Sequence, residues 1–225
     1  MSKIETMLSF AEENYIKAVH HIAESRSGPV STNELADALQ TKAASVTDMV
    51  KKLAKKGLLI HVKYQGVTIT EEGNKVALHI IRKHRLWETF LVRKLGFKWN
   101  EVHEVAEQLE HIRSPLLIQR LDKFLDYPKV DPHGDPIPDS EGRMVNMKSI
   151  ALKELETGCT STVVSASDSS DVFLKYLDQI KITLGSRVRI MERYDYDGSM
   201  MLKVDNHSPV AISEKVAENL FVNPE

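Results

Sequence analysis

The chain has 225 residues, 42% hydrophobic and 28% charged, which is enough to build between one and three globular cores. Its formal net charge of -2 excludes a chain that is polybasic throughout, and it has no apolar run of the length, about 18 residues, that a membrane span requires. The first five residues contain no signal-peptide apolar region, and the single cysteine, Cys159, excludes an intrachain disulfide. We therefore expect a cytoplasmic protein without a membrane partner.

The first part of the chain has the pattern of a winged helix-turn-helix domain, which we place at residues 1–73. Apolar residues at helical spacing predict a helix over residues 4–25. Ser31 and Glu34 form a capping-box pattern that opens a short helix ending near Leu39. A second helix follows the turn at residues 40–42 and ends at Gly57. Two strand-like segments, 59–62 and 67–70, flank a predicted turn at residues 64–66 and complete the pattern.

The second helix and the wing predict a DNA-binding surface. Six lysines and one aspartate lie between residues 42 and 63, a local positive balance that suits phosphate groups. Short side chains at the start of the helix favour contact with thymine methyl groups, whereas the lysines favour phosphates. The predicted DNA-contacting residues are Lys42, Ala44, Ser45, Thr47, Asp48, Lys51, Lys52, Lys55, Lys63 and Gln65.

The middle of the chain predicts a helical domain over residues 74–143. Thr70 is expected to cap a long helix that ends near Gly96, Asn100 to cap the next helix, and Pro115 to take the first position of a third. These helices have more apolar residues than a small bundle can bury, so we expect a homodimer. Residues 127–143 contain prolines and glycines and are predicted to be a linker.

Residues 155–225 predict a separate domain with short strands near residues 162–164, 187–190 and 201–204 and one helix over residues 171–177. We expect a small SH3-like β-barrel. The predicted fold class is thus mainly α with small β elements: a winged helix-turn-helix, a helical dimerisation domain and an SH3-like domain.

Imidazoles and carboxylates gather in the helical domain. At 3.6 residues per turn, His103, Glu107, Glu110 and His111 fall on one face of a predicted helix, and His84 and Glu88 share a face of another. Three imidazoles and three carboxylates without a thiolate suit Mn2+ or Fe2+ better than Cu+ or structural zinc. A zinc protease is not indicated, because no His-Glu-x-x-His pattern occurs. Six ligands are enough for two metal sites in each subunit.

The chain resembles the diphtheria-toxin-repressor family of metal-dependent repressors, including its manganese-sensing branch. The matching motifs are Lys83-His84-Arg85-Leu86-x-Glu88, Val102-His103-Glu104, Glu107-x-x-Glu110-His111, Gly134-Asp135-Pro136-Ile137-Pro138 and Ala44-Ser45-Val46-Thr47-x-Met49-Val50-x-x-Leu53. The resemblance covers nearly the whole chain, and its last part is similar to the ferrous-transport-accessory type of SH3-like domain.

The resemblance implies two metal sites. The ancillary site matches His84, Glu88 and His103, and the regulatory site matches Glu107, Glu110 and His111 with Asn14 from the first helix. Glu13 replaces Asn14 if the alignment is shifted by one residue. Glutamate at position 107, where the iron-sensing branch has cysteine, favours Mn2+, with Fe2+ as the alternative. A second acidic position of the manganese branch matches Lys17, so its closely spaced two-metal site is not expected.

In longer members of the family, the C-terminal domain lends a ligand to the ancillary site, for which Asp168 is a candidate here. Asp171 is more consistent with a helix cap. The remaining histidines, among them His133, are interpreted as surface or core residues. The predicted function is a metal-activated homodimeric repressor of metal-uptake genes that binds a palindromic operator. The alternatives are a winged-helix regulator that senses a non-metal ligand and a metalloenzyme with a DNA-binding arm.

Overall fold

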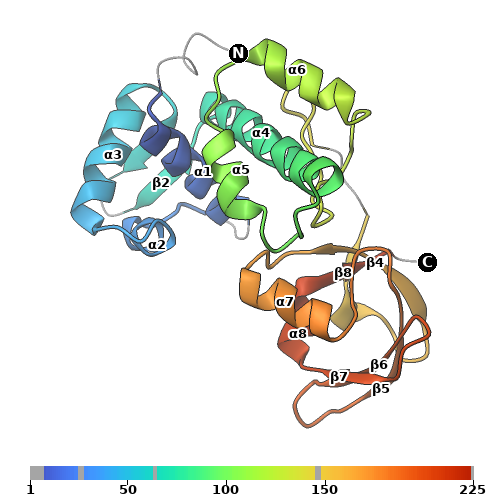
Figure 1. Cartoon of the computed structure of the whole chain (residues 1–225). Coiled ribbons are helices and arrows are strands. Elements are labelled where there is room, and N and C mark those ends of the chain that lie inside the picture. Colours follow the sequence, from blue (N-terminus) through green and yellow to red (C-terminus); the bar gives the residue numbers. More distant parts are fainter. Residues whose placement is uncertain (1–7, 25–27, 63–64, 145–147, 224–225) are drawn as a thin grey trace. The chain divides into compact units, whose positions relative to one another are not determined.

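The computed structural model of the chain describes residues 8–24, 28–62, 65–144 and 148–223 (Figure 1). Contacts divide it into two compact units. The first comprises Met1–His84, Gln108–Arg120 and Pro138–Met144, and the second Arg85–Glu107, Leu121–Ile137 and Val145–Glu225. The predicted domain boundaries at residues 73, 143 and 155 stay predictions. Within the described ranges, no helix combines the length and the apolar character that crossing a membrane requires.

The first unit contains the predicted winged helix-turn-helix elements in the predicted order. They are α1 (Phe10–Glu24), α2 (Thr32–Ala38), α3 (Ala43–Lys55), β1 (Leu59–Val62) and β2 (Gly66–Ile69). The two strands pair antiparallel, with Leu59 opposite Ile69. The capping box at Ser31 and Glu34 is present, and Gly57 follows α3 with a positive φ of 75°. These boundaries agree with the sequence because capping and glycine signals act within a few residues.

Helix α1 begins later than predicted. Residues 4–7 of the predicted helix lie outside the described residues, and Leu8 and Ser9 are not helical. The Ser9 hydroxyl accepts a hydrogen bond from the Glu12 N–H at 3.3 Å, and the Glu12 carboxylate accepts one from the Ser9 N–H at 2.7 Å. This reciprocal cap satisfies two backbone groups at the helix start and fixes it at Phe10.

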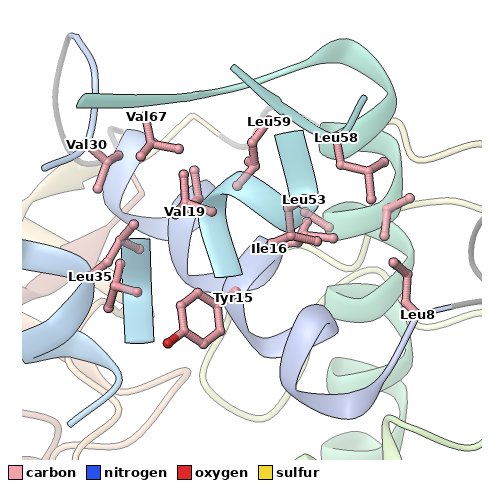
Figure 2. Packing of buried hydrophobic residues seen from close by; sticks show 14 of the residues in the cluster. Leu8, Tyr15, Ile16, Val19, Val30, Leu35, Leu53, Leu58, Leu59 and Val67 are labelled. Atoms are coloured by element: carbon pink, nitrogen blue, oxygen red, sulfur yellow. The ribbon is translucent and has the colours of Figure 1, made fainter. Parts of the chain in front are cut away.

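A continuous apolar core holds α1, α2, α3 and the hairpin together (Figure 2). Val46, Val50 and Leu53 repeat at helical spacing and form the buried face of α3. They pack in the same cluster as Ile16 and Val19 of α1. Truncating a fully buried leucine such as Leu53 to alanine costs about 2 to 5 kcal/mol. The burial of one face of α3 leaves its opposite face to solvent.

Helix α4 spans Glu71–Leu95, as the predicted long helix does. Thr70 caps it, because its hydroxyl accepts a hydrogen bond from the Gly73 N–H at 3.0 Å. A Cβ at Gly73 would lie 2.1 Å from the Leu58 carbonyl oxygen, so only glycine allows this close approach of the helix to the residue before β1. Gly96 ends the helix region with a φ of 73°.

Two further helices follow, α5 (His103–Leu109) and α6 (Pro115–Phe124). Pro115 takes the first position of α6, as predicted, but Asn100 does not cap α5. Its side-chain amide instead donates to Asp171 at 2.9 Å. The expectation of one helical face through residue 111 is also wrong. The Ile112 N–H bonds to the Leu109 carbonyl at 3.1 Å, which is the tighter bond of a terminal turn, so Glu110 and His111 lie beyond the helix.

The C-terminal part of the second unit is a six-stranded antiparallel sheet with the strand order β3-β8-β4-β5-β6-β7. The elements are β3 (Ile150–Ala151), a 3-10 turn (Leu152–Glu154), β4 (Thr160–Ala166), α7 (Asp171–Gln179), β5 (Arg187–Arg193), β6 (Met200–Val204), β7 (Val210–Ile212), α8 (Glu214–Asn219) and β8 (Leu220–Val222). The predicted strands and helix are present. The sequence missed β3, β7, β8 and α8, which are too short for periodicity to identify.

Helix α7 begins at Asp171, as predicted, but its cap differs from the predicted one by one residue. The Ser170 hydroxyl accepts the Phe173 N–H at 3.4 Å, so Ser170 is the cap and Asp171 is the first helical residue. Alternating residues of β5 and β6 enter a core of their own together with Leu174 and Leu177 of α7. With these elements, the predicted fold class of helical domains followed by a small β domain is confirmed.

Candidate metal centres and nucleic-acid interface

The outward face of α3 is the candidate nucleic-acid interface. Exposed residues on or beside this helix are Lys42, Ala44, Ser45, Asp48, Lys51, Lys52 and Lys55, all of which the sequence predicts. Thr47 is half-buried, and its hydroxyl donates to the Ala43 carbonyl at 3.0 Å. Gln65 of the wing is exposed, and Lys63 lies outside the described residues. This face has the short side chains and cations that groove and phosphate contacts require.

A buried carboxylate holds the C-terminal half of α3 against α1. Glu12 is 1% exposed, and its Oε1 lies 2.6 Å from the Lys56 Nζ and 3.3 Å from the Lys52 Nζ. Burial opposes ionisation of Glu12, but the two lysines and the Ser9 N–H outweigh it and lower its pKa to about 2. No sequence pattern indicates this role of Glu12, because its partners Lys52 and Lys56 lie about 40 residues away along the chain.

Replacing Glu12 by glutamine should therefore destabilise the fold in a pH-dependent way. The folded-state pKa lies below the ordinary value, so the ionised carboxylate stabilises the fold above about pH 4.5 and loses this effect as the pH falls towards 2. Because Lys52 and Lys56 are partly exposed, solvent screens their attraction to Glu12. We therefore expect the substitution to lower the free energy of unfolding by about 1 to 2 kcal/mol at pH 7. Urea unfolding at pH 7 and pH 3 measures it.

The matched control is Glu71→Gln, which removes an exposed carboxylate paired with Lys75 at 2.8 Å. It should leave the unfolding free energy nearly unchanged, because solvent screens an exposed ion pair. A destabilisation by Glu12→Gln that is as large at pH 3 as at pH 7 would contradict the ionic role of Glu12.

Glu110 is the centre of the first group of candidate ligands. Its side chain is fully buried, and both of its oxygens accept hydrogen bonds from the Lys17 ammonium, at 2.7 and 2.9 Å. His84 Nδ1 lies 2.6 Å from Oε2 of the same carboxylate. Burial opposes ionisation, but the contacts with His84 and Lys17 outweigh it and lower the pKa of Glu110. The predicted ligands Glu110 and His84 are thus brought together, and Lys17 connects α1 to the Glu110 carboxylate.

His111 meets the first helix through Glu13. The His111 Nδ1 and the Glu13 Oε2 are 2.6 Å apart, and Phe10 stacks on the imidazole at 4.5 Å. Ser9, Phe10, His111 and Arg113 line a surface hollow of about 470 Å³. Glu13, the alternative to Asn14 in the sequence prediction, is therefore the α1 carboxylate at this position.

Asn14 still has a property expected of a ligand. Its Oδ1 is buried and has no hydrogen-bond partner within the described part of the chain. Buried side-chain oxygens are nearly always bonded, so this amide oxygen has the capacity to accept a ligand bond. An amide oxygen, two carboxylates and an imidazole form the donor set that Mn2+ and Fe2+ accept, so the residues of this region fit such an ion. Glu107, on α5, is half-buried.

A second group of candidate ligands surrounds Glu88 in the second unit. His103 Nδ1 lies 3.6 Å from Glu88 Oε1, and the His103 side chain is 52% exposed. The other oxygen, Oε2, lies 3.7 Å from the Nδ1 of His133, which is buried. Glu88, Asp131 and His133 each offer one ligand atom, and these atoms lie within 4.8 Å of one another. All three residues are buried.

Hydrogen bonds orient His133 towards the two carboxylates. Its Nε2 donates to the Trp99 carbonyl oxygen at 2.8 Å, which fixes the proton on Nε2 and points Nδ1 at Glu88 and Asp131. The Trp99 ring stacks on the imidazole with a centroid distance of 6.3 Å and donates from Nε1 to Asp178 at 3.1 Å. The histidine is therefore held by its neighbours in the orientation that a metal ligand requires.

The pKa values of Asp131 and His133 show that burying the cluster of Glu88, Asp131 and His133 without a cation is costly. Burial raises the pKa of Asp131 to about 7, and the charges of Glu88 and Asp135 add to this effect. Burial opposes protonation of His133, yet Glu88 and Asp131 outweigh it and raise its pKa to about 9. Two carboxylates facing a protonated imidazole are groups that a divalent cation can neutralise.

Asp131 and His133 are not among the ligands predicted from the sequence. Residues 127–143, predicted to be a linker, are indeed irregular, but both residues are buried. The available signal was the Asp131-x-His133 pair itself, a carboxylate and an imidazole two positions apart before a glycine with a φ of 87°. Periodicity carries no information in such a loop, so only the ligand types could have indicated it.

The two candidate ligands of the C-terminal domain, Asp168 and Asp171, bond to residues close to them in the sequence. Asp168 accepts a hydrogen bond from the Ser170 N–H at 2.9 Å, as a residue just before a helix does. Asp171 pairs with Lys175 at 2.7 Å. Among the residues that the structure describes, neither belongs to a group of three acidic, histidine or cysteine side chains close enough to hold one ion.

Comparison with known proteins matches three family models to consecutive parts of the chain. They are the N-terminal DNA-binding domain of iron-dependent repressors over residues 7–67, the iron-dependent repressor metal-binding and dimerisation domain over residues 70–139, and the FeoA domain over residues 150–224. Together, these matches account for most of the chain.

Individual relatives agree with the models. The iron-dependent repressor IdeR of Mycobacterium leprae is 26% identical over 93% of this chain and 95% of that protein. The regulator MntR of Bacillus velezensis is 31% identical over 65% of this chain and 95% of its own length. A solved manganese-dependent transcriptional repressor in complex with manganese is 36% identical, with a TM-score of 0.86 and 95% and 100% coverage. For ScaR with bound Cd2+, the values are 31%, 0.81, 95% and 99%.

Proposed function

The chain belongs to the iron-dependent repressor family, whose members are metal-dependent transcriptional repressors and not enzymes, and on this premise we propose that Mn2+ activates it. Family membership argues against both alternatives raised by the sequence, a winged-helix regulator that senses a non-metal ligand and a metalloenzyme with a DNA-binding arm. The donor set supports Mn2+, because the candidate groups offer imidazole, carboxylate and amide ligands without a thiolate. Fe2+ accepts the same ligands and is the alternative.

We place the regulatory ion at Glu107, Glu110 and His111, with Asn14 or Glu13 from α1. The observation that supports this most strongly is the meeting of α1 with the segment after α5, where Lys17 contacts Glu110 and Glu13 contacts His111. An ion held by ligands from both elements restrains α1. Since Glu12 of the same helix binds Lys52 and Lys56, the restraint extends to the recognition helix α3.

A second ion is proposed at Glu88, giving two sites in each subunit. The sequence assigns it to His84, Glu88 and His103. We favour a second set, Glu88 with Asp131 and His133, because all three residues are buried and His133 is oriented by Trp99, although the ligand atoms of both sets lie within 4.8 Å of one another. Asp168, from the C-terminal domain, stays a prediction without structural support.

The matched domain models imply operator binding as a dimer. Apolar side chains on α6 support the pairing of two copies: Leu116 is 56% exposed, and Phe124 is 61% exposed. A twofold dimer reads a palindromic site, with its recognition helices about 34 Å apart or a multiple of that distance. The metal therefore acts by favouring the arrangement of α3 that fits both half-sites. We propose that the regulated genes serve metal uptake.

The test is a titration of operator binding. A duplex selected from a random library by the Mn2+-loaded protein is titrated with chelated protein and with protein loaded with Mn2+, Zn2+ or, under anaerobic conditions, Fe2+. Ionic strength is held constant, because salt alone changes affinity by orders of magnitude. We expect Mn2+ to tighten binding at least tenfold. Equal affinity of chelated and Mn2+-loaded protein would refute the proposal.

A further inference from the structure

Lys17 occupies an unusual position for a lysine. Its ammonium lies in the interior, where the side chain is 11% exposed, and it bonds to both oxygens of the fully buried Glu110 at 2.7 and 2.9 Å. His84 Nδ1 approaches Oε2 of the same carboxylate at 2.6 Å. The carboxylate is therefore engaged on both oxygens by positively charged or hydrogen-bonding groups before any metal arrives.

A divalent ion cannot simply be added to this arrangement. It would have to approach a Glu110 oxygen to about 2.1 Å, while the ammonium stays within hydrogen-bond distance of the same carboxylate. Two cations at such separation repel strongly in a buried place, where water does not screen them. The charge of Glu110 compensates only one of them, and release of the ammonium would remove this repulsion.

We propose that the ammonium of Lys17 is a resident cation of the Glu110 site, which the activating metal ion displaces when it binds. This inference rests on the proposed function and identifies Lys17 as a residue that sets the affinity for metal. In the metal-free protein, the ammonium satisfies Glu110 and keeps the site folded. On metal binding, it is released, and the release acts on α1, the helix that also contains Glu12 and Glu13.

The experiment compares the wild-type chain with Lys17→Met, which removes the charge and keeps an apolar stem of similar length. Mn2+ affinity is measured by competition with a chromophoric chelator, with no DNA present. We expect Lys17→Met to bind one Mn2+ at least tenfold more tightly. The gain should disappear in a Glu110→Gln background, since the two residues are directly coupled. Lys75→Met, which removes an exposed lysine paired with Glu71, is the control and should leave the affinity unchanged.

A second measurement uses the unaltered protein and does not depend on the folding of the variant. Lysine acetylation is followed residue by residue by mass spectrometry, with and without Mn2+. Lys17 should react at least several-fold faster in the Mn2+-loaded protein, whereas Lys75 should react equally in both. Unchanged acetylation of Lys17 in protein that has bound Mn2+, or an affinity of folded Lys17→Met no tighter than wild type, overturns the inference alone. Failure of the wild-type protein to bind Mn2+ at all overturns the proposed function as well.

Discussion

Replacing Glu110 by glutamine is expected to abolish metal-dependent operator binding. The substitution keeps the size of the side chain but removes the charge that a divalent ion needs, at a position that is fully buried. Operator affinity in Mn2+ should fall to that of the chelated protein, a loss of at least tenfold. Fluorescence anisotropy with a labelled operator, with and without Mn2+, measures this directly.

The same loss is expected for His111→Ala, which removes the imidazole that faces Glu13 across 2.6 Å. The matched control is Glu104→Gln, an exposed carboxylate on α5, which should bind the operator as the wild type does. Glu110→Gln also leaves the Lys17 ammonium without its counter-charge, so circular dichroism must show that the variant is folded. Full Mn2+ stimulation of both folded variants would show that these ligands are misassigned.

Replacing His133 by alanine should remove one bound Mn2+ from each chain. His133 is buried, and Trp99 holds it so that Nδ1 faces Glu88 and Asp131, which makes it a preformed ligand. Equilibrium dialysis followed by metal analysis counts the ions that remain, with about one per chain expected where the wild type has about two. Asp131→Asn, which preserves the size of the side chain, should weaken the binding of the same ion and perturb the fold less than His133→Ala does.

His103→Ala separates the two possible ligand sets around Glu88. Its side chain is half-exposed and lies 3.6 Å from the carboxylate, so it contributes less to a buried ion. If His103→Ala loses the ion and His133→Ala keeps it, the sequence-based set of His84, Glu88 and His103 is right. Two ions retained by both variants would place the second metal elsewhere.

Helix α1 links the candidate metal and DNA sites. Within six positions, Glu12 binds Lys52 of the recognition helix and Lys56 at its C-terminal end, Glu13 faces His111, and Lys17 holds Glu110. Because these three side chains belong to one helix, we expect a change at one contact to affect the others. Variants of Glu12 should therefore alter operator affinity as well as stability, although Glu12 itself belongs to neither of the proposed ligand sets.

The sequence alone determined the local elements and the chemical type of the site. The capping box at Ser31, the proline at the start of α6 and the apolar spacing of α3 act over a few residues, so they can be read without knowledge of the fold. The ligand types near residues 84–111 likewise identified metal chemistry. Where helical spacing was extended past Leu109, it failed, because the helix ends there.

Only the tertiary structure decided which of these groups meet. Lys17 and Glu110 are 93 positions apart, His111 and Glu13 are 98 apart, and Glu88 reaches His133 in a segment that looked like a linker. No local rule predicts such pairs. A charged group can be buried only where a partner lies within hydrogen-bond distance, and the fold of the whole chain decides which partner that is. The predicted helical face is not formed, because α5 ends at Leu109. Instead, Lys17 bonds to Glu110, and Glu88, Asp131 and His133 form a buried triad.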